Sequence, residues 1–200
     1  HARRPDDGTG RAWVHDAPEA VLLDPNALVG DGGYLGIGVL DVSPDGRILA
    51  YAVDHEGDER FELCFRDLDS GEDLPDAVEG VAYGFAWASD SATCWYTLQD
   101  QASRPHRVLR HTLGTRTADD LEVFHEPDER FHVTVERSRS GAVAVITSGS
   151  AITSESWLLD TEAPLDPPVL VTAREDGVEY SVAHHPDGLW VTSNHDGAED

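Results

Sequence analysis

The sequence contains no lysine, and basic residues of any kind are few. Fourteen arginines stand against thirty-nine acidic residues, which gives a formal net charge of −25. A field of this sign repels phosphate backbones and anionic lipids, so we expect neither nucleic acid nor a membrane as a partner. It would attract cationic ligands, although acidic surfaces also serve simply to keep proteins soluble. The absence of lysine, with abundant Ala, Gly, Val and Asp, is typical of a GC-rich bacterial genome.

Cysteine, methionine and long apolar runs are also scarce or missing. The two cysteines, Cys64 and Cys94, fall in apolar segments and lack the spacing of metal ligands. This placement predicts ordinary buried thiols in a reducing cytoplasm. No apolar run approaches the length of a membrane span. Because no methionine begins the chain, we expect it to be a piece of a longer protein.

Signatures of catalysis and of metal binding are missing as well. The nucleophile elbow G-x-S-x-G does not occur, and neither does a Gly-rich phosphate loop, a zinc signature or a redox dithiol. The polar runs at 54–59 and 192–197 predict solvated loops rather than calcium sites. We therefore expect no catalytic residue, no metal site and no cofactor in these residues.

What the sequence does contain is a tight-turn signal between two apolar runs. In LDVSPDGRILAYAVD (40–54), Pro44 presets φ and Gly46 accepts the positive φ of a bulged hairpin. One strand should end near Val42 and the next should begin near Ile48. The second run is almost wholly apolar, which predicts a strand covered on both faces.

The same turn pattern returns along the chain. Taking Gly46, Ser91, Gly141 and Gly188 as equivalent points, the spacings are 45, 50 and 47 residues. A period in the forties with four short strands per unit is typical of a β-propeller blade. The expected first strands are 37–42, 85–87, 131–135 and 178–183; third strands ending in polar turns are 61–72, 107–115 and 155–164; fourth strands are 76–81, 121–124 and 169–172.

We therefore predict an all-β fold: a partial β-propeller of about three and a half four-stranded antiparallel blades, from a presumed seven-bladed ring. Residues 1–35 would lead into the propeller, and residues 36–200 would form it. The expected blades are 36–82, 83–128 and 129–175, with a half blade at 176–200.

Seven phrases, in order, resemble the propeller of the prolyl oligopeptidase family. They are EAVLLDPNAL (19–28), SPDGRILAYAVDHEGDE (43–59), FRDLDSGE (65–72), FAWASD (85–90), RVLRHTLGT (107–115), TSESWLLD (153–160) and GVEYSVAHH (177–185). The phrases LLDPN, RHTLGT and VEYSVAHH are similar to the oligopeptidase B, or protease II, branch. Only about the first ten residues fall outside the resemblance.

The resemblance implies a serine peptidase of two domains. An α/β-hydrolase domain would carry a Ser, Asp, His triad, and a seven-bladed propeller would cap it. Oligopeptidase B enzymes cleave short peptides after Arg or Lys, mostly in the cytosol. The catalytic domain follows the propeller in this family, so the triad would lie beyond Asp200 and no catalytic residue can be assigned here. The implied partners are that C-terminal domain in cis and short basic peptides.

The implied role of the propeller is to filter substrates, because rigid walls over an active site admit flexible peptides and exclude folded proteins. A net negative lining would also concentrate basic peptides. Glu59 falls where members of the family carry a charged residue between the domains. We predict that Glu59, helped by Asp58, pairs with an arginine of the catalytic domain; the alternative is a merely solvated loop carboxylate.

Two other interpretations stay open. TolB-like propellers contain similar SPDG blades, bind protein partners or small ligands, and hydrolyse nothing. A metal-dependent lactonase propeller would need convergent carboxylates and asparagines around its channel, for which the sequence offers no compelling set. The sequence beyond Asp200 would discriminate, because a G-x-S-x-G elbow indicates the peptidase and further blades followed by a stop indicate the binding protein.

Overall fold

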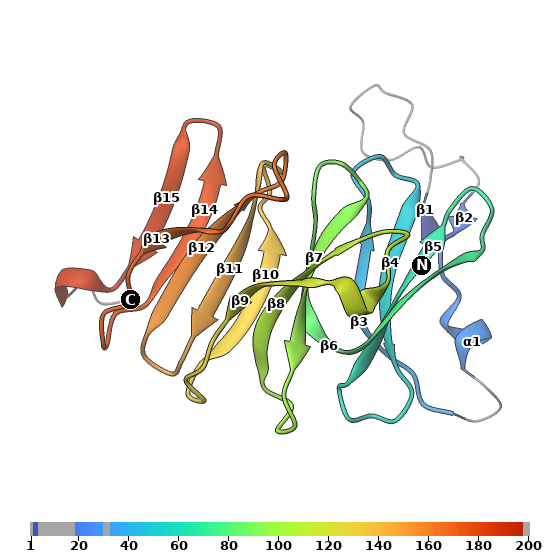
Figure 1. Ribbon diagram of the computed structural model, residues 1–200, viewed down its shortest axis with the longest axis horizontal. Helices are drawn as coiled ribbons and strands as arrows, with labels where there is room; N and C mark the ends of the chain where they lie inside the picture. The colour runs from blue at the N-terminus through green and yellow to red at the C-terminus, as the bar shows by residue number, and fades with distance from the viewer. Residues whose placement is uncertain (1, 4–18, 30–32, 198–200) are drawn as a thin grey trace.

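The computed structural model describes residues 2–3, 19–29 and 33–197 (Figure 1), and these form an all-β structure, as predicted. Besides the helix α1 (Pro25–Leu28) and two single 3₁₀ turns, η1 (Thr117–Asp119) and η2 (His195–Gly197), the elements are strands. They are β1 (Ala2–Arg3), β2 (Ala20–Val21), β3 (Gly36–Val42), β4 (Ile48–Asp54), β5 (Phe61–Asp67), β6 (Asp73–Trp87), β7 (Thr93–Gln99), β8 (Pro105–Thr112), β9 (Leu121–His125), β10 (His132–Arg137), β11 (Val143–Gly149), β12 (Ser154–Asp160), β13 (Val169–Thr172), β14 (Tyr180–His185) and β15 (Gly188–Ser193).

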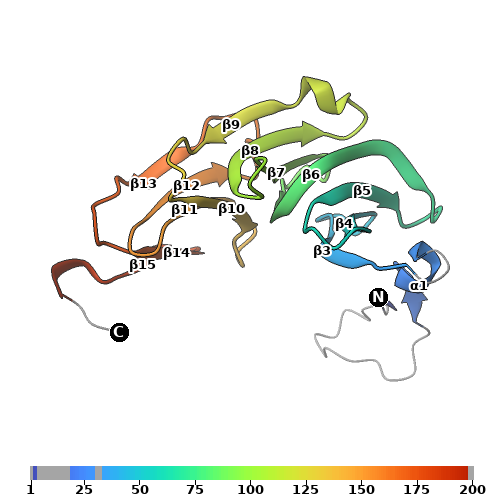
Figure 2. The ribbon, with the colours of Figure 1, turned by 90° about the horizontal axis from the view of Figure 1, so that it is seen from below.

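The strands form successive antiparallel groups of four that fan out around an open arc (Figure 2). The first group is β3, β4, β5 and the start of β6; the second is the end of β6 with β7, β8 and β9. The third is β10 to β13, and the hairpin β14–β15 follows. We call these blades 1 to 3 and the half blade. The sheets do not close on themselves, which confirms the expectation of a partial propeller.

Blades 1 and 2 share one strand, which corrects an expectation. Separate strands were predicted at 76–81 and 85–87, but β6 runs unbroken over Asp73–Trp87. Its register shifts between Val81 and Phe85 as it leaves β5 and joins β7. Two glycines permit this passage. Gly80 has φ +74°, and a Cβ on Gly84 would lie 2.7 Å from the Thr97 side chain and 2.8 Å from the Val135 nitrogen.

The predicted hairpin is present, with β3 ending at Val42 and β4 beginning at Ile48. Gly46 has φ +77° and donates its N–H to the Ser43 carbonyl (2.8 Å). Ser91 and Gly141 also have positive φ, +58° and +75°, so three of the four proposed equivalent points agree. Gly188 differs because it begins β15 directly after a two-residue turn and has φ +141°.

The first strand of the half blade begins two residues later than predicted. Residues 175–178 form a turn in which the Val178 N–H bonds the Glu175 carbonyl (3.0 Å) and Gly177 has φ +80°. The first strand of the half blade is therefore Tyr180–His185 rather than 178–183. Tyr180 fixes this strand to blade 3, because its N–H donates to the Ser154 hydroxyl (2.7 Å).

Apolar side chains fill the spaces between the blades. Trp87 is fully buried and meets Phe65 and Phe85 edge-on, at 5.7 and 5.3 Å between ring centres. Trp95 is fully buried in a second cluster, between blades 2 and 3. The strand β4 is buried from Leu49 to Asp54, which confirms the expectation that both of its faces are covered.

A buried polar group also joins blades 1 and 2. His111 of β8 places Nδ1 2.8 Å from an oxygen of Asp120 and Nε2 3.1 Å from an oxygen of Asp76 in β6. The Tyr96 hydroxyl donates to the other Asp120 oxygen (2.8 Å). Buried side chains from both blades therefore satisfy one another's hydrogen-bonding groups here.

The cysteines lie in different blades, as expected, and are free thiols. Cys94 is fully buried, as predicted, whereas Cys64 is partly exposed, which corrects the prediction of two buried thiols. Burial raises the pKa of Cys64 to about 11. Among the helices in the described ranges, none has the length and apolar character needed to cross a membrane.

The segment 1–35 was expected to lead into the propeller. Residues 1, 4–18 and 30–32 of it lie outside the described residues, as do residues 198–200 of the expected half blade. In the described part, Asp24 caps α1 by accepting the Asn26 N–H (3.0 Å), and Pro25 occupies the first turn.

Candidate functional site: the loop face

Two kinds of connection meet at one edge of the fan, the lower edge in Figure 1. These are the turns after the second strand of each blade and the linkers that lead from a fourth strand to the next blade. They share an edge because strands alternate in direction within a blade, and β10 runs parallel to β6 at the pair Glu136 and Phe85. We call this edge the loop face, and it consists of segments 55–60, 100–104, 126–131, 150–153 and 173–179.

The same cap closes each of the three turns on the loop face. Asp54 accepts the N–H groups of Glu56 and Gly57 (both 2.8 Å) and of Glu59 (2.9 Å). At the corresponding points, Asp100 accepts from Ala102 (2.8 Å), and Ser150 accepts from Thr153 (3.1 Å). Burial raises the pKa of Asp54, but the three N–H donors outweigh it and hold that pKa below its ordinary value. These turns are therefore ordered by their own side chains.

The structure places both predicted site residues, Glu59 and Asp58, on the loop face with exposed side chains. Glu59 has φ +61°, a conformation that is costly for a residue other than glycine. Tyr83 of β6 stands beside it, and its pKa is raised by burial and then by the Glu59 carboxylate. Tyr83 also packs edge-on against Phe61, with ring centres 4.9 Å apart. The turn thus presents a carboxylate next to an exposed aromatic ring.

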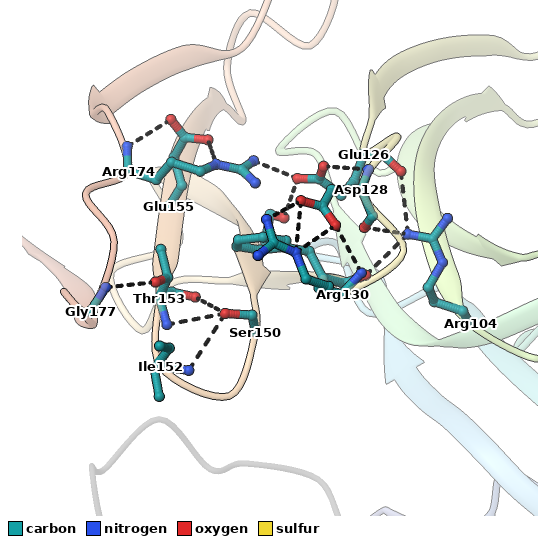
Figure 3. Close-up of polar contacts among 12 residues, drawn as sticks. Arg104, Glu126, Asp128, Arg130, Ser150, Ile152, Thr153, Glu155, Arg174 and Gly177 are labelled. Atoms are coloured by element: carbon teal, nitrogen blue, oxygen red, sulfur yellow. Dashed lines mark hydrogen bonds and ion pairs between the residues drawn. The ribbon is translucent and has the colours of Figure 1, made fainter.

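Arg104 is held inside the loop face, with its side chain only 11% exposed. Its Nε donates to the Asp100 carboxylate (3.0 Å). Its Nη1 faces the carbonyl oxygens of Glu126, Asp128 and Phe131, at 3.3, 3.0 and 3.1 Å (Figure 3). One guanidinium therefore organises the whole linker between blades 2 and 3.

A second arginine joins this linker to the end of blade 3. Arg174 contacts the carboxylates of both Glu126 and Glu155 (Figure 3), and its guanidinium lies 4.1 Å from the centre of the Phe131 ring. The side chain of Glu126 is buried and also accepts from the Ser148 hydroxyl (2.7 Å). Burial raises the pKa of Glu126, but Arg174 and then Ser148 outweigh it and hold the pKa below its ordinary value.

Most of the charged side chains lie on the loops rather than on the inner strands. On the inner strands (β3, residues 82–87 of β6, β10 and β14) the acidic and arginine side chains are Asp41, Glu136 and Arg137. The segments of the loop face carry ten acidic side chains and four arginines. Each of those arginines is engaged by a carbonyl or carboxylate of the same face. The opposite edge is acidic as well, so net charge alone does not select a face.

Sequence reasoning missed Arg60, Arg104, Glu126 and Arg174. One signal was available, because Arg60 and Arg104 are 44 residues apart, which is close to the blade period, and each follows a turn capped by an aspartate. Within the described ranges, no group of three or more His, Cys, Asp or Glu side chains is placed to hold a metal ion. The arrangement is suited to presenting charge and holding backbone in place.

Comparison with known proteins gives a consistent result. The family model described as "Prolyl oligopeptidase, N-terminal beta-propeller domain" matches residues 1–200. Protease 2 of Moraxella lacunata is 37% identical over 92% of this chain and 27% of its own length. Dipeptidyl aminopeptidase BI of Pseudoxanthomonas mexicana is 37% identical over 99% of this chain and 28% of its own length.

Solved structures agree. Oligopeptidase B from Trypanosoma brucei, in a closed form with covalently bound antipain, has a TM-score of 0.84 at 32% identity, over 98% of this chain and 27% of that one. Oligopeptidase B from Leishmania major has a TM-score of 0.86 at 25% identity, over 94% of this chain and 27% of that one. The chain thus spans little more than a quarter of the length of these relatives.

Proposed function

The chain belongs to the prolyl oligopeptidase family, as part of its N-terminal β-propeller domain, and from this membership we propose that it filters substrates for a serine oligopeptidase. The parent protein would resemble oligopeptidase B and cleave short peptides after Arg or Lys in the cytoplasm. Its Ser, Asp, His triad would lie in a C-terminal α/β-hydrolase domain outside these residues. Residues 36–200 would supply about half of a seven-bladed ring.

The observation that carries this proposal is the dense hydrogen bonding of the loop face. Its three turns are capped by buried or partly buried side chains, and its linkers are wrapped around Arg104 and Arg174. A filter must keep its shape while large chains press on it, and loops without such anchors would open locally. The net charge of −25 favours the approach of basic peptides over acidic ones.

The length dependence of hydrolysis tests the filter. The full-length protein is assayed on fluorogenic peptides that end in Arg or Lys, and on the same cleavage site placed in a surface loop of a folded protein. We expect short peptides to be cleaved and the folded protein to resist, with a serine-directed inhibitor abolishing the activity. Equal cleavage of both substrates would refute the filter. No hydrolysis at all would favour the TolB-like binding protein instead.

Glu59 is the residue that we propose meets the catalytic domain, with Asp58 beside it. Supporting this, the capped turn fixes its backbone, and its side chain is exposed next to Tyr83. An exposed ion pair contributes at most about 1 kcal/mol, so pairing with an arginine would tune opening rather than hold the fold together.

Small-angle scattering of the full-length Glu59→Gln variant tests this pairing. We expect a larger radius of gyration and altered turnover, because the closed state would lose one contact. Glu56→Gln, in the same exposed turn, is the matched control and should change neither quantity. An unchanged scattering profile together with unchanged turnover in Glu59→Gln would end the idea.

A further inference from the structure

The backbone around Glu59 is held by Asp54 of its own blade and also by contacts from the neighbouring blade. The Gln99 side-chain amide donates to the Glu59 carbonyl (2.7 Å). The Arg60 guanidinium donates through both terminal nitrogens to the Asp100 carbonyl (2.9 and 3.2 Å). Gln99 ends β7 and Asp100 begins the following turn, so both belong to blade 2. The position of Glu59 therefore depends both on the cap by Asp54 and on how the turn of blade 2 is held.

The turn of blade 2 is in turn fixed by Arg104. The Asp100 carboxylate accepts the N–H groups of Ala102 (2.8 Å) and Arg104 (3.1 Å) through one oxygen. Its other oxygen accepts from Nε of Arg104 (3.0 Å). Burial raises the pKa of Asp100, but its contacts with Arg104 and Ala102 outweigh it and keep the pKa below its ordinary value.

Arg104 carries the same series of contacts onward to blade 3. The three carbonyl oxygens around its Nη1 belong to residues 126–131, the linker that leads into β10. Glu126, in that linker, reaches the end of blade 3 through Arg174. Polar contacts thus run without interruption along the loop face, from Glu59 to Arg174, and Arg104 lies near the middle.

We propose that Arg104 is a positioning residue of the loop face, which fixes the Glu59 turn on one side and the linker 126–131 on the other. This inference rests on the proposed function only in giving Glu59 a partner domain; the positioning itself is a property of the described residues. Lysine cannot substitute fully, because a single ammonium cannot reach the Asp100 carboxylate and all three carbonyl oxygens together.

Hydrogen–deuterium exchange of the full-length protein tests the proposal, with Arg104→Lys as the milder variant and Arg104→Met as the stronger. Losing hydrogen bonds of this kind should speed exchange by roughly two- to tenfold. We expect this acceleration in the linker 126–131 and also in the Glu59 turn, whose Glu56, Gly57 and Glu59 amides bind Asp54. The second site is informative because Arg104 does not touch it.

Two further variants sharpen the test. Gln99→Met removes the direct bond to Glu59, so exchange should rise in 55–60 and stay unchanged in 126–131. Arg116→Met, 81% exposed and paired with Asp119 on the opposite edge, should change neither segment. Acceleration confined to 126–131 in both Arg104 variants, or absent from both segments, would overturn the proposal.

Peptide hydrolysis measured on the same samples separates this proposal from the function. If the unmodified protein cleaves no peptide but Arg104→Lys still speeds exchange in the Glu59 turn, the filter proposal fails and the positioning role of Arg104 stands. If the unmodified protein cleaves short peptides normally but neither Arg104 variant speeds exchange in the Glu59 turn, the positioning role fails and the filter proposal stands.

Discussion

Replacing Arg174 by methionine should leave a buried carboxylate without its cation. Glu126 is only 2% exposed, and its carboxylate pairs with the guanidinium of Arg174. Arg174 also binds Glu155 (2.8 Å) and stacks on Phe131. Charge-assisted hydrogen bonds contribute about 1.5–3 kcal/mol each, and breaking a buried ion pair costs about 3–5 kcal/mol. Since Arg174 itself is 30% exposed, we expect a loss of about 2–4 kcal/mol of stability at pH 7.

The loss should depend on pH in a definite direction. The pKa of Glu126 in the folded protein lies below its ordinary value of 4.5. Its ionised form therefore stabilises the fold above pH 4.5, and this stabilisation disappears as the pH falls through the folded value. In Arg174→Met the buried carboxyl should take up a proton more readily. The difference between the variant and the unmodified protein should then shrink between pH 7 and pH 4.

The difference is measured by unfolding the full-length protein in urea and monitoring the hydrogen exchange of peptides from 121–160, which report on the propeller. Arg130→Met is the matched control, because Arg130 also faces the Phe131 ring and pairs with a carboxylate but is 77% exposed. It should behave like the unmodified protein. A loss in Arg174→Met no larger than that of the control, or one that stays constant down to pH 4, would refute the reasoning.

Three other predictions concern packing, backbone and thiol chemistry. Gly84→Ala should lower the urea midpoint of the propeller transition, with a cost of about 1–3 kcal/mol, because its Cβ would meet the Thr97 side chain and the Val135 nitrogen. Ser103→Gly should raise the same midpoint, because Ser103 has φ +61° and glycine relieves this strain; the expected gain in the free energy of unfolding is about 0.5–1 kcal/mol. A lowered midpoint would contradict this. Cys94 should resist a thiol reagent until the protein unfolds, as mapped by mass spectrometry, because it is fully buried.

Sequence reasoning reached most of the fold because the signals were local. Turn residues such as Pro44 and Gly46 act within four residues, and the composition of an apolar strand is enough to predict that it is buried. It failed at β6, where two expected strands are one. The passage there depends on Gly84 lying against Val135 of another blade, and such a contact cannot be seen in a local pattern. The predicted start of a strand was also wrong where a polar turn replaces its first residues, as in the turn at Gly177 that precedes β14.

The candidate site was less accessible to prediction. Glu59 and Asp58 were placed by resemblance, and the structure adds the capped turn around them. Arg104 and Arg174 act on partners 19–48 residues away, apart from the nearby Asp100. A buried glutamate such as Glu126 resembles any surface acid in a sequence with thirty-nine acidic residues. Only the fold shows which of them is enclosed.

The strand shared by blades 1 and 2 has a consequence for where this propeller can tolerate a change in length. A residue added within a continuous strand reverses which side chains beyond it face the core, because side chains alternate between the two faces of a strand. One insertion between Gly80 and Gly84 would turn the buried face of one blade toward solvent. The same insertion in 173–179 would only lengthen a surface turn. Natural insertions should therefore spare the first joint and collect at the later ones, so that blades 1 and 2 are inherited as a single unit.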